Sequence, residues 1–505
     1  MTLLSGAIAA IVVSASAVPA GEPLRQQVST YVTAHQREIV RELVELLSIP
    51  NVAPDAANIR RNAEHLRAMF AKRGFTAGLL ETSGNPLVHA ELRVPGATRT
   101  LLLYSHYDGQ PVNPAAWKQK DPWTPVLRRG RLQDGAGDVA WPDVTAFEPD
   151  WRVYARSASD DKSPIVMILT AIDALKANGL QPTSNIRVIL DGEEEAGSPS
   201  LVPAITQYRD KLAADLMLIF DGPIHTSGRP TIAFGARGIL TGTLTIYGPR
   251  SGVHSGNYGN WIPNPALRLA HLLASMKDDR GRVQVAGFYD GVQPLPDEER
   301  ALVAAVPDDS ERMLRAFGVA APEAAGRSLQ EGLQTPTLNI RGLASAFVGA
   351  GARTIIPDRA VAEIDIRLVK ETRAADLRAR VDAHLRAQGY HLLDREPNDA
   401  ERATHARLAS MVWDASATEA FRTPPLHPQA RALAAALERA YGAPPVQIRT
   451  LGGTVPIAPF IDALGFPAAL VPTVNFDNNQ HEENENLRLG HFFDGIVTAA
   501  AVLRM

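Results

Sequence analysis

Three apolar runs of this chain end in an imidazole or in carboxylates. They are TLLLYSHYD at 100–108, IRVILDGEEE at 186–195 and LMLIFD at 216–221. Apolar runs that alternate with helical patterns are typical of strands in a parallel sheet covered by helices. The carboxyl ends of such strands lie at one edge of the sheet, where α/β proteins bind their ligands. We therefore predict an α/β fold with a helix-covered, mostly parallel sheet that gathers these polar residues at one edge.

The pattern of the chain predicts that one domain is inserted into another. After residue 222 the apolar residues change to a two-residue alternation, which is typical of half-buried strands. Beyond residue 424 the alternation of helices and strands returns. The predicted α/β domain therefore comprises 22–222 and 425–505, and it is interrupted by an α+β domain at 223–424.

Composition narrows the classes of function. The chain has 505 residues, more than one core usually organises, so two or three domains are expected. Its 51 basic and 55 acidic residues give a net charge of -4, which argues against a nucleic-acid partner and favours a small molecule. There is no cysteine in the sequence, so any metal ion must be held by His, Asp and Glu.

The first 21 residues are small and apolar and carry no charge. Ala15, Ser16 and Ala17 form the small-x-small pattern of a cleavage site, which predicts a signal peptide or an uncleaved anchor and a secreted or periplasmic protein. The stretch departs from the usual pattern because no Lys or Arg precedes the apolar run. No later stretch reaches about 18 uninterrupted apolar residues, so no other membrane segment is expected.

Several carboxylates and two imidazoles are candidates for one site. Alternate residues of a strand share a face, so His106 and Asp108 can point the same way. Each candidate also has a structural explanation, since a turn His that contacts an Asp, a helix cap and a solvated acidic turn are all common. The remaining candidates lie before a helix, after two strands and in the late polar loop NNQHEENEN: Asp160, Asp161, Glu193, Glu194, Glu195, Asp221 and His481. Their convergence would require cations, because unpaired carboxylates repel one another.

One arrangement of these residues would hold two divalent ions. His106, Asp160 and Asp221 would bind one ion, and Asp160, Glu195 and His481 would bind the other, so that Asp160 bridges. Each ion would then have three protein ligands and a position open to a shared water. Nitrogen and oxygen ligands with open positions suit catalytic Zn²⁺, with Mn²⁺ or Co²⁺ as alternatives.

The sequence resembles the dinuclear zinc exopeptidases and amidohydrolases, a family that includes carnosinase-type dipeptidases, aminoacylases and succinyl-diaminopimelate desuccinylase. The resemblance extends from about residue 30 to the end and is strongest to the dipeptidases. It rests on motifs that follow the order of the family: SHYDGQPV, SDDKSP, DGEEEAGSPS, GVHSGNYGN, RTIIP, IDIRLV and GGTVP. The resemblance implies the ligand set above and an inserted α+β lid or dimerisation domain. It also implies a homodimer formed through the inserted domain.

The resemblance further implies roles for single residues. Asp108 would orient His106, Glu194 would act as general base, and Glu193 would be solvated. His254 would reach the active site of a partner subunit and polarise the scissile carbonyl, although without its motif a plain turn His would be the better explanation. Substrate contacts are implied for Arg367, Thr354, Gly453 and Thr454, of which Arg367 would bind a free carboxylate. Two features depart from the family: Ser163 replaces a usual Gly, and residues 131–150 form an additional surface loop.

We therefore predict a zinc-dependent dipeptidase-like exopeptidase that cleaves a peptide bond near a free carboxylate. The predicted mechanism is attack by a metal-bound hydroxide, with Glu194 taking the proton of the water and passing it to the leaving amine. The substrate would be a small peptide or an N-acyl amino acid, so an N-acyl-amino-acid amidohydrolase is the near alternative. The alternative of another class is a non-catalytic binding protein of the same fold.

Overall fold

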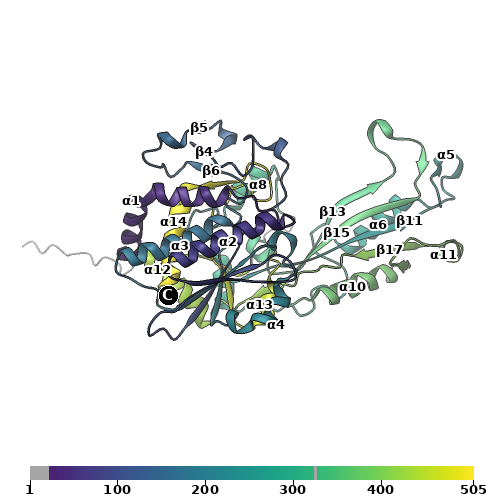
Figure 1. Ribbon diagram of the computed structural model, residues 1–505. Helices are drawn as coiled ribbons and strands as arrows, with labels where there is room; N and C mark the ends of the chain where they lie inside the picture. Colours follow the sequence, from purple (N-terminus) through teal and green to yellow (C-terminus); the bar gives the residue numbers. More distant parts are fainter. Residues whose placement is uncertain (1–21, 324–326) are drawn as a thin grey trace, which may run out of the picture.

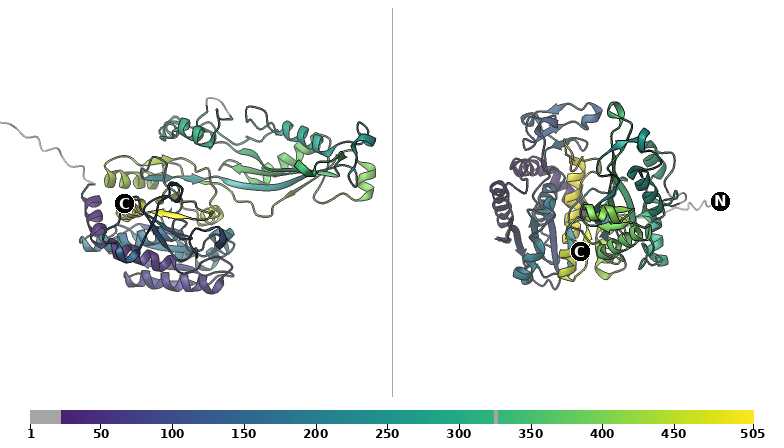
Figure 2. Two further views of the ribbon diagram at one scale, coloured as in Figure 1. Left: turned by 90° about the horizontal axis from the view of Figure 1, so that it is seen from above. Right: turned by 90° about the vertical axis from the view of Figure 1, so that its right-hand side faces the viewer.

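The computed structural model describes residues 22–323 and 327–505 and has two bodies. One contains an eight-stranded sheet between layers of helices, and the other is an elongated body built on a five-stranded sheet (Figure 1). Figure 2 shows the second body extending to one side of the first. The predicted signal or anchor at residues 1–21 lies outside the described residues.

The eight-stranded sheet has the order β1-β2-β7-β3-β8-β20-β9-β19. Its central strands β7, β3, β8 and β20 run parallel, whereas β1–β2, β2–β7 and β20–β9 pair antiparallel. The mixed, mostly parallel α/β sheet predicted from the apolar runs is confirmed. Its strands are β1 (Thr76–Leu80), β2 (Leu87–Leu92), β3 (Thr100–His106), β7 (Asn185–Asp191), β8 (Leu216–Ile219), β9 (Thr231–Ala233), β19 (Val446–Ile448) and β20 (Ala468–Leu470).

Helices bury both faces of this sheet. Leu101 and Leu103 of β3 join the core on one face, and Leu102 and Tyr104 join the core on the other. This alternation explains why the strands read as continuous apolar runs. The first core includes α1 (Glu22–Leu47), α2 (Ala56–Lys72), α3 (Lys162–Ala177), α12 (Pro428–Tyr441) and α14 (Leu489–Leu503), and the second includes α4 (Leu201–Leu212) and α13 (Ala458–Leu464).

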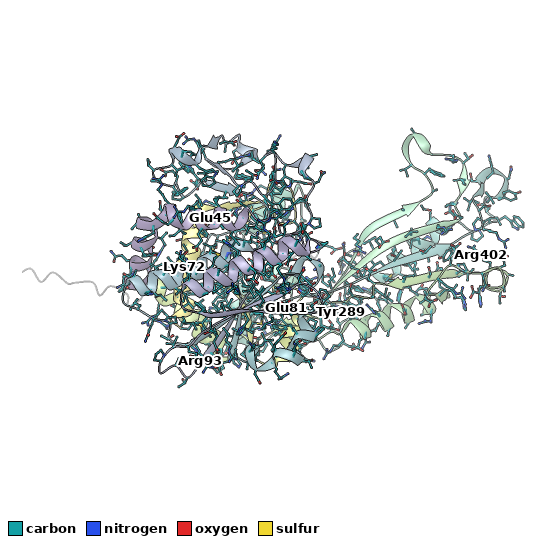
Figure 3. The ribbon with its side chains drawn as sticks, in the orientation of Figure 1. Glu45, Lys72, Glu81, Arg93, Tyr289 and Arg402 are labelled. Carbon is teal, nitrogen blue, oxygen red and sulfur yellow. The ribbon has the colours of Figure 1, made fainter. Side chains whose placement is uncertain are left out.

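The five-stranded sheet has the order β13-β15-β11-β17-β16 and has one face packed on helices. It is antiparallel except for the β16–β17 pair. Arg402, labelled in Figure 3 in the extended body, donates to the backbone of Gly248. The elements are β11 (Gly238–Tyr247), β13 (Thr337–Ser345), β15 (Arg359–Leu368), β16 (His391–Leu393), β17 (Leu408–Trp413), α6 (Pro265–Met276), α10 (Ala374–Ala387) and α11 (Asp399–Thr404).

The two bodies are joined at a short pair of strands, β10 (Gly235–Ala236) and β18 (Phe421–Arg422). A helical segment also contacts the first body, through α7 (Asp297–Ala304) and the loop before α8 (Ser310–Phe317). Glu299 of α7 pairs with Arg449 at 2.5 Å, and Asp308 pairs with His225 at 3.0 Å. The short helix α9 (Leu329–Gly332) follows. The domain boundaries at 222 and 424 stay predictions.

A small four-stranded sheet lies beside the first body, in the order β21-β6-β4-β5. Part of the 131–150 segment, expected to be a loop, belongs to it, because β5 (Asp138–Val139) pairs with β4 (Val126–Arg128). The other members are β6 (Arg152–Tyr154) and β21 (Asn486–Arg488). At the far end of the five-stranded body, β12 (Val253–His254) pairs with β14 (Ile355–Ile356) and leads into α5 (Ser255–Tyr258). Among the described helices, none has the length and apolar character of a membrane span.

The start of β11 depends on glycine at position 238. A Cβ there would collide with the carbonyl oxygen of Thr418 and lie 2.7 Å from the amide nitrogen of Ala420. Because these are backbone atoms, we expect Gly238→Ala to destabilise the protein by about 1–3 kcal/mol. Gly78→Ala is the control, since nothing lies within 4 Å of its Cβ position. Urea unfolding midpoints measure both, and equal midpoints would contradict the crowding at Gly238.

Candidate active site

The predicted polar residues follow neighbouring strands at one edge of the eight-stranded sheet. His106 ends β3 and is fully buried, and it pairs in register with Asp191 at the end of β7. A single turn after β7, Glu194–Ala196, carries Glu194 and Glu195. Asp221 follows β8, and Asp160 lies just before α3. The parallel order of β7, β3 and β8 therefore brings residues from distant parts of the chain to one edge.

Asp160 lies between two imidazoles. Its Oδ1 atom is 2.9 Å from Nε2 of His106, and its Oδ2 atom is 3.1 Å from Nε2 of His481. His481 Nε2 is also 3.5 Å from Oε2 of Glu195. Asp160 and Glu195 have buried carboxylates, whereas the side chain of His481 is 54% exposed. Each oxygen of Asp160 thus faces a different imidazole nitrogen, which is the disposition that a bridging carboxylate requires.

Asp108 connects the His106 side of the site to the turn after β7. One of its oxygens lies 3.3 Å from Nδ1 of His106, a close contact without the alignment of a hydrogen bond. The same carboxylate accepts from the backbone N–H groups of Glu194 at 3.1 Å and Glu195 at 3.0 Å. Asp108 is fully buried, so these contacts are shielded from water. This carboxylate therefore fixes the position of the Glu194–Glu195 turn relative to the imidazole.

The three consecutive glutamates differ in their surroundings. Glu195 accepts from the side-chain amide of Gln110 at 2.6 Å, a contact that the sequence did not indicate. Glu193, expected to be solvated, is instead half-buried and accepts from the backbone N–H of Asn85 at 2.9 Å. Burial raises the pKa of Glu194 well above its usual value, and the charges of Asp221, Asp160 and Glu195 raise it further. A carboxylate with a raised pKa is suited to accept a proton near neutral pH.

The charges at the site are unbalanced without a cation. Burial raises the pKa of Glu195 to about 7 and that of Asp221 to about 6, and in both cases the charge of Asp160 adds to the effect. Burial also opposes ionisation of Asp160, but the contacts with His106 and His481 hold its pKa below the usual range. The contact with Asp160 raises the pKa of His481 to about 9. Such mutual effects are expected where acidic groups share a buried space.

Two groups of side chains have the chemistry and spacing of a metal site. The ligand atoms within each group lie within 4.8 Å of one another, and their oxygen and nitrogen donors suit a catalytic divalent ion. The groups are His106, Asp161 and Asp221, and Asp160, Glu195 and His481. The second group is one of the two predicted ligand sets. The first group contains the predicted residues His106 and Asp221, with Asp161 where Asp160 was predicted. The donor set therefore fits a divalent metal ion.

Asp161 is a site residue whose role the sequence did not indicate. Its Oδ2 atom accepts from the hydroxyl of Ser105 and, at 3.2 Å, from the backbone N–H of His106. Its Oδ1 atom has no hydrogen-bond partner among the described residues. The only signal in the sequence is the doubled Asp in SDDKSP, which does not tell which of the two faces the imidazole.

The predicted substrate residues form two further groups. Nη1 of Arg367 donates to the hydroxyl of Thr454 at 2.8 Å, and the neighbouring carbonyl of Gly453 accepts from Arg237 N–H at 3.1 Å. Thr354 Oγ1 lies 3.4 Å from Nε2 of His254. The second pair sits beside α5, at the end of the five-stranded body that is remote from the eight-stranded sheet (Figure 1). Within one chain, His254 and Thr354 are therefore apart from the carboxylates.

Buried carboxylates beside one buried and one half-exposed imidazole, at the ligand edge of an α/β sheet and with metal-site spacing, indicate the class of metal-dependent hydrolases. Residues 102–505 match the model of Peptidase family M20/M25/M40. The chain belongs to this family, whose members include metal-dependent hydrolases of peptide bonds. The family predicted from the motifs is confirmed.

The relatives and the structures that match cover most of the chain. Cys-Gly metallodipeptidase dug1 of Schizosaccharomyces pombe is 26% identical over 91% of this chain and 93% of its own. Beta-Ala-His dipeptidase of Homo sapiens is 25% identical over 95% of this chain and 92% of its own. The M20 family metallo-carboxypeptidase Sso-CP2 from Sulfolobus solfataricus superposes with a TM-score of 0.71 and 29% identity, covering 92% of this chain and 98% of its own. The two dipeptidase matches support metal-dependent dipeptidase activity.

The prediction of a secreted or periplasmic protein is wrong. The finding that overturns it is the match to the Cys-Gly metallodipeptidases of Schizosaccharomyces pombe and Saccharomyces cerevisiae, over 91% and 83% of this chain. The prediction rested on residues 1–21, which lie outside the described residues. Their small and apolar composition was a weak basis for it, because the basic residues that ordinarily precede the apolar run of an export signal are missing.

Metal affinity should rise with pH. Glu195 and Asp221 hold protons below about pH 6–7, and His481 holds one below about pH 9, so a bound cation must displace them. We expect the observed Kd for Zn²⁺ to increase at least about tenfold between pH 8 and pH 5.5, with release of protons on binding. Calorimetric titration in two buffers of different ionisation enthalpy measures both quantities. Equal affinity at the two pH values would contradict the proposed ligands.

Proposed function

We propose that this chain is a zinc-dependent dipeptidase that hydrolyses a peptide bond near a free carboxylate. The observation that carries the proposal is Asp160, whose two oxygens face His106 and His481 separately. Two relatives that span nearly the whole chain are dipeptidases by name, which supports the substrate class.

Two Zn²⁺ ions would be held by residues of this chain, with Mn²⁺ or Co²⁺ as alternatives. His106, Asp160 and Asp221 would hold one ion, and Asp160, Glu195 and His481 the other. Asp161 lies close enough to His106 and Asp221 to contribute to the first group. When bound, such ions lower the pKa of a water molecule and polarise a carbonyl oxygen.

Glu194 is proposed to take a proton from the attacking water at its carboxylate and to pass it to the nitrogen of the leaving amine. Its burial and its raised pKa suit both steps, because the same group must accept and then release one proton. Asp108 assists by holding the backbone of Glu194 in place. The products are then an amine and a carboxylate, with one water consumed.

The substrate's free carboxylate is proposed to bind Arg367, beside Thr454 and the backbone of Gly453. A guanidinium can donate two parallel hydrogen bonds to a carboxylate, and the hydroxyl of Thr454 already fixes one nitrogen of Arg367. The guanidinium of Arg367 would therefore select a peptide with a free carboxyl terminus near the scissile bond.

His254 is proposed to act in the active site of a partner subunit in a homodimer formed through the inserted domain. Its Nδ1 atom accepts from the backbone N–H of Gly256 at 3.0 Å, so the neutral ring carries its proton on Nε2. That N–H can donate to the scissile carbonyl oxygen, with Thr354 alongside. The position of α5, remote from the carboxylates of its own chain, supports action in trans (Figure 1).

The general-base role predicts a selective loss of turnover. With Zn²⁺ loaded, wild-type protein should hydrolyse dipeptides faster than N-acyl amino acids. Glu194→Gln should lower kcat on dipeptides about 10²–10⁴-fold with the metal content unchanged. Steady-state kinetics and elemental analysis measure this.

Glu193→Gln is the matched control, because the adjacent residue has the same chemistry but contacts Asn85. It should keep kcat near the wild-type value. Unchanged turnover in Glu194→Gln would contradict the role of Glu194 as general base. A preference of the wild-type protein for N-acyl amino acids would contradict the proposed dipeptidase activity.

Action in trans predicts complementation between two inactive variants. His254→Ala and Glu194→Gln should each be nearly inactive alone. A mixed dimer would contain one complete site, so subunits exchanged at equal concentration should regain roughly a quarter of the wild-type activity. No recovery in confirmed mixed dimers would show that His254 acts within its own chain or not at all.

A further inference from the structure

Glu485 is a fully buried carboxylate in the loop that also carries His481. We propose that Glu485 is a positioning residue that fixes the backbone of Asp160 and joins the Asp160 loop to the His481 loop. The inference rests on the proposed role of Asp160 as the bridging ligand. Glu485 itself belongs to neither group of candidate ligands.

The carboxylate of Glu485 accepts four hydrogen bonds from one short segment. Oε1 accepts from the backbone N–H groups of Ser159 at 2.8 Å and Asp160 at 2.9 Å. Oε2 accepts from the backbone N–H of Ser157 at 2.9 Å and from Nη1 of Arg156 at 2.9 Å. Glu485 therefore binds the segment 156–160, including the backbone amide of Asp160.

A carboxylate suits this position better than any neutral side chain. It offers about four acceptor sites on two oxygens, which matches the four converging donors. An amide of the same shape would turn its NH₂ group toward two of these N–H groups and leave them unsatisfied. Because the site is buried, each unsatisfied donor would destabilise the local structure.

The same contacts join two segments that are far apart in the sequence. Glu485 directly precedes β21, and Arg156 is the second residue after β6. These two strands pair antiparallel. The hydroxyl of Ser159 also donates to the backbone of Asn486 at 2.9 Å. His481 lies four residues before Glu485 in the same loop. The 3.1 Å contact between His481 and Asp160 therefore lies beside a junction in which both oxygens of Glu485 are hydrogen-bonded.

The test compares the affinity of full-length variants for Zn²⁺, measured by titration against a competing chelator. Groups that orient metal ligands typically account for 10- to 100-fold in affinity. We expect Glu485→Gln to weaken binding of at least one ion by this factor, and Glu485→Asp to recover part of the loss. Folding is monitored by circular dichroism and by the thermal midpoint of the metal-free protein.

Asp477→Asn is the matched control. Asp477 lies in the same loop and pairs with Arg152 of β6 at 2.8 Å, so its loss loosens the same two segments without touching residues 157–160. It should lower the thermal midpoint but change the Zn²⁺ affinity less than about threefold. If Asp477→Asn weakens Zn²⁺ binding as much as Glu485→Gln does, the effect comes from a general loosening of the two segments and the proposal is wrong.

Asp160→Ala separates this inference from the proposed function. If Asp160→Ala loses Zn²⁺ but a folded Glu485→Gln binds both ions normally, only the positioning role is overturned. If Asp160→Ala binds both ions normally, the ligand assignment falls and the positioning role falls with it.

Hydrogen–deuterium exchange on the wild-type protein gives an answer even if the Glu485 variants do not fold. Slow exchange of the peptide containing residues 156–161 supports the junction, and exchange at the rate of an exposed loop overturns it.

Discussion

Electrostatic repulsion among buried carboxylates is the constraint on which the site depends. Parallel strands place Asp221 and the turn after β7 beside Asp160, and burial removes the water that would otherwise screen them. The two imidazoles offset part of this charge, which explains why the pKa of Asp160 falls while the pKa values of Glu195 and Asp221 rise. The remaining imbalance is what a divalent cation corrects. The same arrangement that makes the metal-free site unfavourable therefore supplies the oxygen and nitrogen donors that a divalent ion binds.

The backbone around the site is organised by two further carboxylates. Asp108 holds the turn that carries Glu194 and Glu195, and Glu485 accepts from the amides around Asp160. Both are fully buried and bound to main-chain N–H groups. Hydrogen bonds to main-chain N–H groups hold the backbone of a residue in place and leave its side chain unengaged. The carboxylates of the candidate site can therefore remain free for ions and substrate while their positions stay fixed.

Much of this organisation could be predicted from the sequence, because the spacing of apolar residues along the chain follows the secondary structure and its burial. The runs that became β3, β7 and β8 were found nearly to the residue. The partners of Asp161 and Glu193 could not be predicted, because neighbouring acidic residues have the same composition and differ only in how the backbone turns. The apolar residues of the segment at 131–150 are interrupted by Gly, Pro and Asp and follow no regular period, so its pairing with β4 left little pattern. The localisation prediction from residues 1–21 failed because an apolar run with a small-x-small pattern is weak evidence for export without preceding basic residues.

The pairing of Gly235 with Arg422 places the entrance and the exit of the extended body on adjacent strands. Cα atoms of antiparallel partners are only about 5 Å apart, so a tight turn could span the two ends. The chain therefore enters and leaves the extended body side by side, while Glu299 and Asp308 add contacts with the first body elsewhere. A change of length within the extended body would therefore leave the path of the chain through the eight-stranded sheet unchanged, provided that contacts such as Arg367 with Thr454 are kept.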